Sequence, residues 1–268
     1  MFKDPEARIV GKESWGDYFL LTFDSPAVSA LARPGQFLMI KVSDEPYPLL
    51  RRPLGIHSRK DKTLGVFFKV AGIGTALLAR KTPGETLDLL GPLGKGFNID
   101  PCLAGKPVLA VGGGRGIAPL YFLAWELRAL GASIKILYGG RTQADLPLAD
   151  KLRAEGFDFA CSTDDGTVGR RGLVTELMED EIKAGGGSPP ALVCACGPDP
   201  MLQAVALIAR DKRLPAELSL ESRMGCGFGA CWGCVQRIRR DGKAEWIKIC
   251  EDGPVFPAES VVWEKESP

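Results

Sequence analysis

The spacing of hydrophobic positions along the chain changes near residue 100. Before that point, short runs of β-branched and apolar residues are separated by Gly and Pro, a pattern typical of an antiparallel barrel or sandwich. The strands expected from these runs cover residues 7–12, 17–23, 35–42, 63–70 and 85–91. We therefore predict that residues 1–100 form an all-β domain.

After a linker at 100–106, strand-like apolar runs alternate with longer helix-like segments. The expected strands are 106–114, 133–140, 157–163 and 191–197, and the expected helices are 116–131, 146–156 and 201–213. This alternation predicts a doubly wound parallel sheet over residues 101–215, with its ligand at the carboxyl ends of the strands. The run GGGSPP at 185–190 is expected to be a turn-forming loop of this domain.

A third unit, residues 216–268, contains a cysteine pattern. Cys226, Cys231 and Cys234 follow the spacing C-x4-C-x2-C, and Cys250 comes later. This is the ligand spacing of plant-type 2Fe-2S clusters. The turn signal Asp241-Gly242 between two strand-like runs predicts a hairpin that returns Cys250 to the loop. Four cysteines can also hold zinc, although zinc sites usually have two C-x-x-C knuckles and this chain has one.

Composition narrows the class of protein. The chain is 45% hydrophobic and 25% charged, with a formal net charge of +1, so nothing points to nucleic acid. No apolar run is long enough to span a membrane, and the first residues lack the features of a signal peptide. We therefore expect a cytoplasmic protein. The four cysteines outside the cluster pattern are expected to pack as small apolar residues; they are Cys102, Cys161, Cys194 and Cys196.

Two motifs in the β domain are suited to anions. Adjacent arginines, Arg51 and Arg52, lie in a mostly apolar stretch, where their burial is costly unless they meet an anion such as a pyrophosphate. Surface arginines on an edge strand are an equal alternative. Residues 72–75 form a Gly-x-Gly-Thr turn before a helix-like run, a position that presents backbone N–H groups to an anion.

The roles of His57 and Trp232 are less certain from the sequence, and more than one is considered for each. His57 is the only histidine, which excludes Rieske ligation because that needs two histidines. A structural or flavin-adjacent role is expected for it. Trp232 lies between two cluster cysteines. It would cap the cluster, fill a partner interface or simply be buried over the loop, and we favour the last of these.

The α/β domain opens with a glycine-rich turn, in which Gly112, Gly113, Gly114 and Gly116 would let a phosphate approach a helix N-terminus. The turn does not match G-x-G-x-x-G, and residues 138–141 contain no acid to hold a ribose. Arg141 would be able to approach a 2′-phosphate, so both NAD and NADP stay open, and a solvated loop residue is at least an equal alternative for it. The remaining expected contacts are at the end of one strand, namely Cys196, Gly197 and Pro198. The TDDG run at 163–166 ends another strand and is expected to be either a second wall or a solvated turn.

Taken in this order, the motifs resemble the ferredoxin reductase superfamily. Within it, the loop ESRMGCGFGACWGC followed by CEDGPVF is most similar to electron-transfer subunits of class 1B, NAD-dependent dihydroorotate dehydrogenase. The resemblance implies an FAD-binding barrel at 1–100, an NAD-binding domain at 101–215 and a 2Fe-2S module at 216–268. It also implies FAD contacts at Arg52, Pro53, Leu54, Gly55, Phe67, Phe68, Lys69, Gly74 and Thr75, and cluster ligation by Cys226, Cys231, Cys234 and Cys250.

The implied function is electron transfer in pyrimidine biosynthesis, from a partner FMN subunit through the 2Fe-2S cluster and FAD to NAD. The expected assembly is a heterotetramer of two plus two subunits, and no side chain of this chain is expected to act as an acid or base. Two departures stand out, because the family usually has Ser at Gly55 and an apolar residue at Arg115. The alternatives are a diaphorase subunit of a hydrogenase, sulfur-reducing or other redox complex, and a nucleotide-sensing zinc protein without electron transfer.

Overall fold

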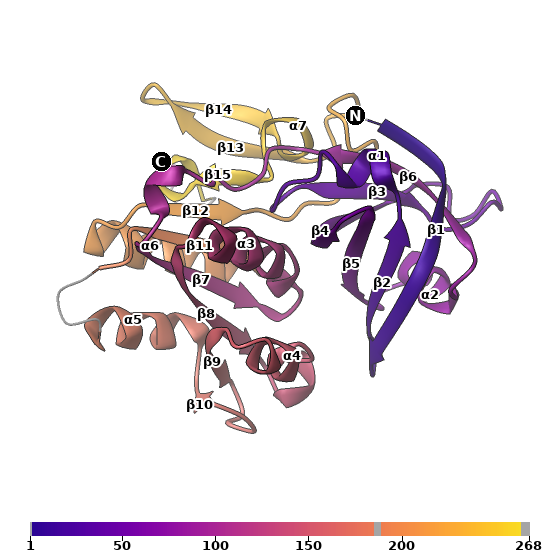
Figure 1. Ribbon diagram of the computed structural model, residues 1–268. Coiled ribbons are helices and arrows are strands. Elements are labelled where there is room, and N and C mark those ends of the chain that lie inside the picture. Colours follow the sequence, from indigo (N-terminus) through magenta and orange to yellow (C-terminus); the bar gives the residue numbers. More distant parts are fainter. Residues whose placement is uncertain (1, 185–188, 264–268) are drawn as a thin grey trace.

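The computed structural model describes residues 2–184 and 189–263, and contains a β barrel, a parallel sheet covered by helices, and a small hairpin module (Figure 1). Residues 185–188 of the predicted GGGSPP loop lie outside the described residues. No helix within the described ranges is long and apolar enough to cross a membrane.

The N-terminal strands close into a six-stranded antiparallel barrel in the order β1-β2-β5-β4-β3-β6. Closure comes from pairing of β6 with β1, which removes the exposed sheet edges. The interior is filled by aliphatic and aromatic side chains from every strand. The elements are β1 (Phe2–Trp15), β2 (Tyr18–Asp24), α1 (Pro26–Ser29), β3 (Phe37–Lys41), β4 (Arg52–Lys60), β5 (Thr63–Lys69), α2 (Ile73–Arg80) and β6 (Thr86–Leu93).

The second part is a seven-stranded sheet in the order β10-β9-β8-β7-β11-β12-β15, parallel except for the edge strand β15. Chain order runs outward from β7 to β9 and then returns to β11 on the other side of β7. This reversal makes a topological switch point, where the carboxyl ends of β7 and β11 diverge and leave room for a ligand. The strands are β7 (Pro107–Gly113), β8 (Ser133–Gly140), β9 (Asp158–Thr163), β10 (Arg170–Arg171), β11 (Leu192–Cys196), β12 (Ala216–Ser219) and β15 (Val255–Pro257).

Helices cover both faces of this sheet. Side chains of α3 and α4 share one core with a sheet face, and those of α5 and α6 share another core with the opposite face. Helix α3 is apolar around most of its circumference because it is packed between the sheet and barrel strand β4. The helices are α3 (Ile117–Leu130), α4 (Ala149–Ala154), α5 (Val174–Ala184) and α6 (Asp199–Lys212), with short 3-10 turns at Pro101–Leu103, Gly114–Gly116, Gln143–Asp145 and Ala258–Ser260.

The cysteine module is built on the hairpin of β13 (Val235–Arg240) and β14 (Lys243–Lys248), followed by α7 (Ile249–Asp252). Asp241 and Gly242 both have positive φ angles, 52° and 77°, as a two-residue type I′ turn requires. The predicted hairpin is therefore confirmed, and it places Cys250 beside Cys234.

The predicted fold class is confirmed, but two features of the second sheet lay outside the prediction. Helix α5 was not expected, although its spacing of apolar positions is amphipathic. Strands β12 and β15 come from the segment assigned to the cluster module, yet they pair with β11 and with each other in the sheet. The module is thus tied to the nucleotide domain by shared strands, and the division at residue 215 stays a prediction.

Candidate functional site

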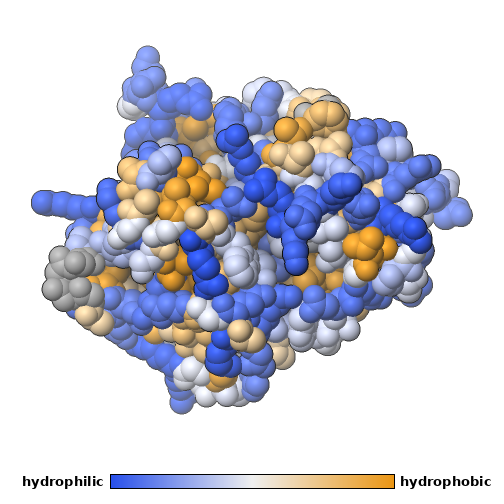
Figure 2. Space-filling model, viewed as in Figure 1, coloured by the Kyte–Doolittle hydropathy of each residue, from blue (hydrophilic) through white to orange (hydrophobic). Residues whose placement is uncertain are grey.

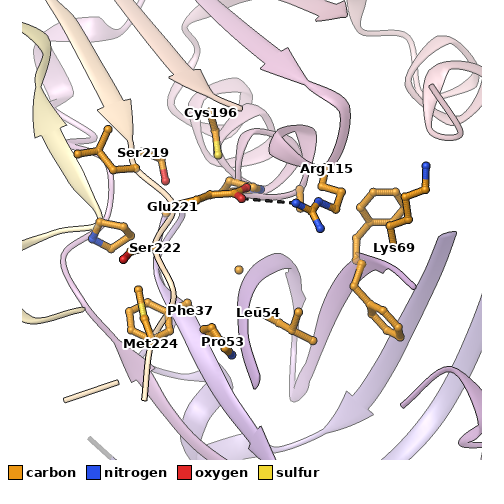
Figure 3. A pocket seen from close by; sticks show the side chains of 18 of the residues that line it. Phe37, Pro53, Leu54, Lys69, Arg115, Cys196, Ser219, Glu221, Ser222 and Met224 are labelled. Carbon is orange, nitrogen blue, oxygen red and sulfur yellow. Dashed lines mark ion pairs between the residues drawn. The ribbon is translucent and has the colours of Figure 1, made fainter. Parts of the chain in front are cut away.

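A cavity lies between the barrel and the sheet (Figure 3). Strand β4 and strand β5 present one wall, the start of α3 and the end of β11 present another, and the segment leading to the cysteine loop closes the third. Seven of the nine barrel residues expected at FAD line this cavity. They are Pro53, Leu54, Gly55, Phe67, Phe68, Lys69 and Thr75.

The other two expected residues lie against each other at the start of α2. A Cβ on Gly74 would come within 2.2 Å of Arg52 Nε, so the absence of a side chain lets the guanidinium lie on this helix turn. The first N–H groups of the helix and the guanidinium together suit an anion. The neighbouring Arg51 instead pairs with Asp88 at 2.7 Å, so only Arg52 of the two is free of an ion pair among the described residues.

In the glycine-rich turn, some glycines pack closely against neighbouring segments and one faces open space. A Cβ on Gly116 would come within 2.0 Å of the Cys196 carbonyl oxygen, and one on Gly113 within 2.7 Å of Met201 Sδ. These two glycines therefore let the turn pack against the end of β11 and the first turn of α6. Gly114 has a φ of +53° with no neighbour within 4 Å of its added Cβ, so it faces open space.

A second cavity lies over the carboxyl edge of the parallel sheet. Strand ends β7, β8, β9 and β11 line it through Gly113, Gly140, Asp164 and Gly197 respectively, together with Pro198. Of the TDDG run, Asp164 lines this cavity and is also exposed, so its role as a second wall stays a prediction. The sulfurs of Cys194 and Cys196 belong to the same core, as predicted from the period of two along a strand, and Cys196 borders the first cavity.

Asp145 is an acidic residue of the second cavity that the sequence analysis missed. Its carboxylate accepts a hydrogen bond from Tyr18 Oη at 2.8 Å, and pairs with Lys69 at 3.1 Å and Arg141 at 3.4 Å. Burial alone would raise the pKa of Asp145, but the hydrogen bonds from Tyr18 and Lys69 outweigh it and lower the pKa. Asp145 lies four residues after Arg141, one short turn beyond the segment searched for a ribose-binding acid.

The four predicted cluster cysteines form two pairs. The thiols of Cys226 and Cys231 lie within hydrogen-bonding reach of each other, as do those of Cys234 and Cys250. In the described ranges, no group of three or more His, Cys, Asp or Glu side chains converges on one point.

Backbone N–H groups point at these sulfurs. Gly229 N lies 3.2 Å from Cys250 Sγ, and Cys250 N lies 3.5 Å from Cys234 Sγ. Burial of the Cys226 thiol raises its pKa, but N–H groups of the loop outweigh this and lower it to about 6. Burial and the neighbouring Cys234 thiol raise the pKa of Cys250 to about 12. The N–H groups of the loop therefore stabilise the thiolate form of Cys226.

Three comparisons with known proteins bear on this arrangement. The model of the iron-sulfur cluster binding domain of dihydroorotate dehydrogenase B matches residues 221–262, and the model of the oxidoreductase NAD-binding domain matches 110–206. The dihydroorotate dehydrogenase B (NAD(+)) electron transfer subunit of Desulforamulus reducens is 36% identical over 92% of this chain and 93% of its own length. The same subunit of Bacillus caldolyticus is 42% identical over 90% of this chain and 91% of its own.

The chain belongs to this family of electron transfer subunits. A solved structure of NADH-dependent reduced ferredoxin-NADP oxidoreductase is 32% identical, with a TM-score of 0.82 over 98% of this chain and 91% of that one. A ferredoxin NADP+ reductase from Neisseria gonorrhoeae with bound FAD and NADP has a TM-score of 0.65 at 21% identity, over 78% of this chain and 91% of that one. The similarity to the Neisseria gonorrhoeae structure shows that the two proteins share a fold.

Membership of the electron transfer subunit family makes this chain an oxidoreductase subunit with an NAD-binding domain and an iron-sulfur binding domain. The family name also implies a catalytic partner subunit. The resemblance inferred from the motifs is therefore confirmed.

Two predictions about single residues were wrong. Trp232 is not buried cover: its side chain is 57% exposed, with Lys248 Nζ 4.8 Å from its ring centroid. Cys102 is also exposed, because it lies in the short 3-10 turn between the barrel and the sheet. The other three cysteines outside the cluster pattern are buried, as expected.

His57 is fully buried where β4 meets α3. Its ring stacks on Tyr121 at 4.2 Å between centroids, and neither ring nitrogen has a hydrogen-bond partner among the described residues. Burial, with a smaller contribution from the charge of Lys151, lowers the pKa of His57 to about 3. The imidazole is therefore neutral at physiological pH, in agreement with a structural role.

Proposed function

We propose that this chain carries electrons between a dihydroorotate-oxidising partner and NAD, through a 2Fe-2S cluster and an FAD. The main support for this proposal is that the barrel cavity, the nucleotide cavity and the cysteine loop adjoin one another. Met224 lines the barrel cavity and lies two residues before Cys226, while Lys69, Arg115 and Glu221 line both that cavity and the nucleotide cavity. Electrons would therefore have a short path from the thiolates to the nicotinamide.

The barrel cavity suits FAD. Its walls are apolar at Phe67 and Pro53, as the face of an isoalloxazine requires, and its far end has the anion site of Arg52, Gly74 and Thr75. Bound FAD would supply the conversion between paired electrons of nicotinamide and single electrons of an iron-sulfur cluster. The protein would position the flavin and would supply a cavity of matching shape.

For the cysteine loop we propose a 2Fe-2S cluster held by Cys226, Cys231, Cys234 and Cys250. The spacing C-x4-C-x2-C with one distant cysteine supports two irons over one zinc, because zinc sites usually have two C-x-x-C knuckles and this chain has one. The N–H groups directed at sulfur would tune the reduction potential of such a cluster.

For the second cavity we propose NAD, with contacts at Gly112, Gly113, Gly114, Gly116, Cys196, Gly197 and Pro198. Open space at Gly114 leaves room for a phosphate at the start of α3. Arg141, the residue able to meet a 2′-phosphate, is already paired with Asp145, and Asp164 adds a negative charge to the same cavity. Both features support NAD over NADP.

We further propose that the partner is an FMN-containing dihydroorotate dehydrogenase subunit, in a heterotetramer of two plus two, and that it docks beside the cluster. Phe228, Trp232 and Trp246 are 49%, 57% and 61% exposed around the cysteine loop and its hairpin. Hydrophobic residues gather near α7 in the view of Figure 2. Exposed aromatic side chains are typical anchors of protein interfaces.

The decisive experiment is purification of the chain with its bound partner, followed by an assay of dihydroorotate-dependent NAD reduction. The expected result is NADH formation that needs both subunits, with visible absorbance from flavin and iron-sulfur groups. An intact complex without this activity would contradict the assignment, and a colourless chain that binds nucleotide would favour the zinc alternative.

Cys231→Ser tests the order of the electron carriers, and Cys102→Ser is a matched control at an exposed thiol outside the loop. We expect Cys231→Ser to abolish dihydroorotate-dependent NAD reduction but to leave NADH oxidation by artificial acceptors, because the latter bypasses the cluster. Survival of both activities in Cys231→Ser would show that the cluster is not between FAD and the partner.

A second candidate is the same module in another redox complex, such as a hydrogenase or sulfur-reducing assembly. It is favoured by the 32% identity and TM-score of 0.82 to the reduced ferredoxin-NADP oxidoreductase structure. Identification of the co-purified partner separates the two, because an FMN-containing α/β barrel favours dihydroorotate and a nickel-iron subunit favours hydrogenase.

A further inference from the structure

The ammonium group of Lys248 is directed at the cysteine loop. Lys248 is the last residue of β14, at the point where the hairpin runs into α7 (Figure 1). Its side chain is only 18% exposed, and lysine is seldom buried to this degree without partners. Its Nζ donates a hydrogen bond to the carbonyl oxygen of Gly229 at 2.9 Å and forms an ion pair with Glu251. The end of the hairpin is therefore bonded directly to the loop that contains Gly229.

Gly229 connects this ammonium to a cluster cysteine. Its carbonyl oxygen accepts the hydrogen bond from Lys248, and its N–H is directed at Cys250 Sγ at 3.2 Å. Gly229 has a φ of +89°, and an added Cβ would come within 2.6 Å of Glu251 Oε2. Since the two bonded groups belong to adjacent peptide units of one residue, a bond that holds the carbonyl oxygen also fixes the direction of the N–H.

Trp232 lies on the same ammonium. Lys248 Nζ is 4.8 Å from the centroid of the indole ring, within the range of a cation–π interaction. Trp232 has a φ of +55°, which is rare for a bulky residue, and its side chain is 57% exposed. Burial of the ring therefore does not account for this backbone conformation, whereas the contact with Lys248 gives a reason for it.

Electron transfer changes the charge at the cysteines. One electron that enters from the partner adds one negative charge to a centre held by thiolates, and this charge is removed when the electron passes on to the flavin. No bond forms or breaks in this step, and no proton moves. A nearby positive charge favours the state with the extra electron, and a nearby negative charge disfavours it. A lysine ammonium is positive at neutral pH, so Lys248 would favour entry of the electron.

We propose that Lys248 is a positioning residue of the electron relay, which holds the Gly229 N–H against Cys250 and raises the reduction potential of the cluster by its charge. This inference rests on the proposed 2Fe-2S cluster and assigns a residue outside its ligands to the control of its potential. Glu251 has the opposite effect, because its carboxylate holds the ammonium in place but offsets part of its charge. Trp232, which covers the ammonium, belongs to the exposed aromatic surface proposed for the partner.

Lys248→Met tests the proposal, because methionine keeps an unbranched apolar stem but has neither the charge nor the donor. Lys248→Arg keeps both. Lys243→Met is the matched control, since Lys243 is an exposed lysine at the other end of the same strand, beside the turn. Glu251→Gln removes the opposing charge and keeps an oxygen that can accept from the ammonium. Iron and flavin contents of each purified complex establish that it is loaded.

The readout is the midpoint potential of the cluster, measured in the complex by a redox titration followed by electron paramagnetic resonance. Lys248→Met should lower the ratio of reduced to oxidised cluster about tenfold at a fixed potential, which is about 59 mV for one electron. Lys248→Arg should stay within about twofold of the wild type, and Lys243→Met should match it. Glu251→Gln should shift the ratio about threefold in the opposite direction, which a loss of packing alone would not produce.

An unchanged or higher midpoint in loaded Lys248→Met would overturn the proposal, and so would an equal shift in Lys243→Met. If Lys248→Met does not retain iron, Glu251→Gln decides: a higher midpoint supports the role of charge, and an equal or lower one overturns it. A wild-type complex without the resonance of a reduced 2Fe-2S cluster would instead contradict the proposed function.

Discussion

His57 shows how strongly one residue depends on its surroundings. The sequence marks it as the only histidine, and its chemistry would allow a proton shuttle at neutral pH. Complete burial against Tyr121 removes that option, because the charged imidazolium would lose its hydration without a partner. Neither this burial nor the ion pair of Arg115 can be read from local sequence, since the packing partners lie in distant segments.

The buried neutral His57 predicts a loss of stability in acid. The unfolded chain binds a proton below its ordinary pKa of 6.5, whereas the folded chain binds one only near pH 3, so the free energy of unfolding falls as pH decreases from 6.5 toward 3. Between about pH 7.5 and pH 5.5 this residue should remove about 1.4 kcal/mol.

Urea unfolding of the wild type and His57→Phe at these two pH values checks the prediction. The wild type should lose about 1.4 kcal/mol more than the variant over this interval. Equal losses would mean that His57 has the same pKa in the folded and the unfolded protein, and would contradict the prediction. Lys3→Met, at an exposed position of β1, serves as a control for removal of a surface cation.

At the scale of elements, the cluster site depends on a hairpin that brings residues 234 and 250 together. The C-x4-C-x2-C spacing and the Asp-Gly turn both predicted this arrangement, because each acts through local backbone geometry. The role of β12 and β15 was not predictable in the same way. Strand β12 joins the sheet by pairing with β11, and β15 joins it by pairing with β12 across the whole intervening cysteine loop and hairpin.

Gly242 is the residue on which the hairpin turn depends. Its φ of +77° is unfavourable for residues with a Cβ, so Gly242→Ala should cost roughly 1–2 kcal/mol, whereas Gly242→Asn should cost less because asparagine tolerates this region. Loosening of β13 and β14 should also free Cys250 from the loop.

Thermal bleaching of the cluster absorbance checks this expectation. The midpoint should be lower for Gly242→Ala than for the wild type, with Gly242→Asn between them. Identical bleaching curves would show that the turn does not limit retention of the cluster.

At the scale of the whole molecule, function depends on how the barrel meets the parallel sheet. Asp145 at the carboxyl edge of the sheet receives a hydrogen bond from Tyr18 and an ion pair from Lys69, both in the barrel. This contact fixes the two cavities side by side, so that Lys69 lines each of them.

Asp145→Ala should lower the free energy of unfolding by about 1–3 kcal/mol, because it leaves buried hydrogen-bonding groups without a partner. It should also slow bleaching of the flavin by NADH, since the two parts of the molecule would be held less firmly. Asp150→Ala removes the acid of an exposed pair with Arg153 and should cost under about 1 kcal/mol.

Chemical unfolding and stopped-flow absorbance measure the two effects. A variant Asp145→Ala as stable and as fast as Asp150→Ala would show that the contact between barrel and sheet is held by apolar packing alone.

The sequence by itself determined the features that arise from local spacing. The cysteine pattern, the Asp-Gly turn and the alternation of strands and helices each act within a few residues, so they predicted the cluster module and both larger folds. Only the tertiary structure decided which side chains share a cavity. The network of Asp145 and the position of Glu221 between two cavities depend on contacts between segments far apart in the chain. Local periodicity contains no information about those contacts, because they form only when barrel and sheet pack together.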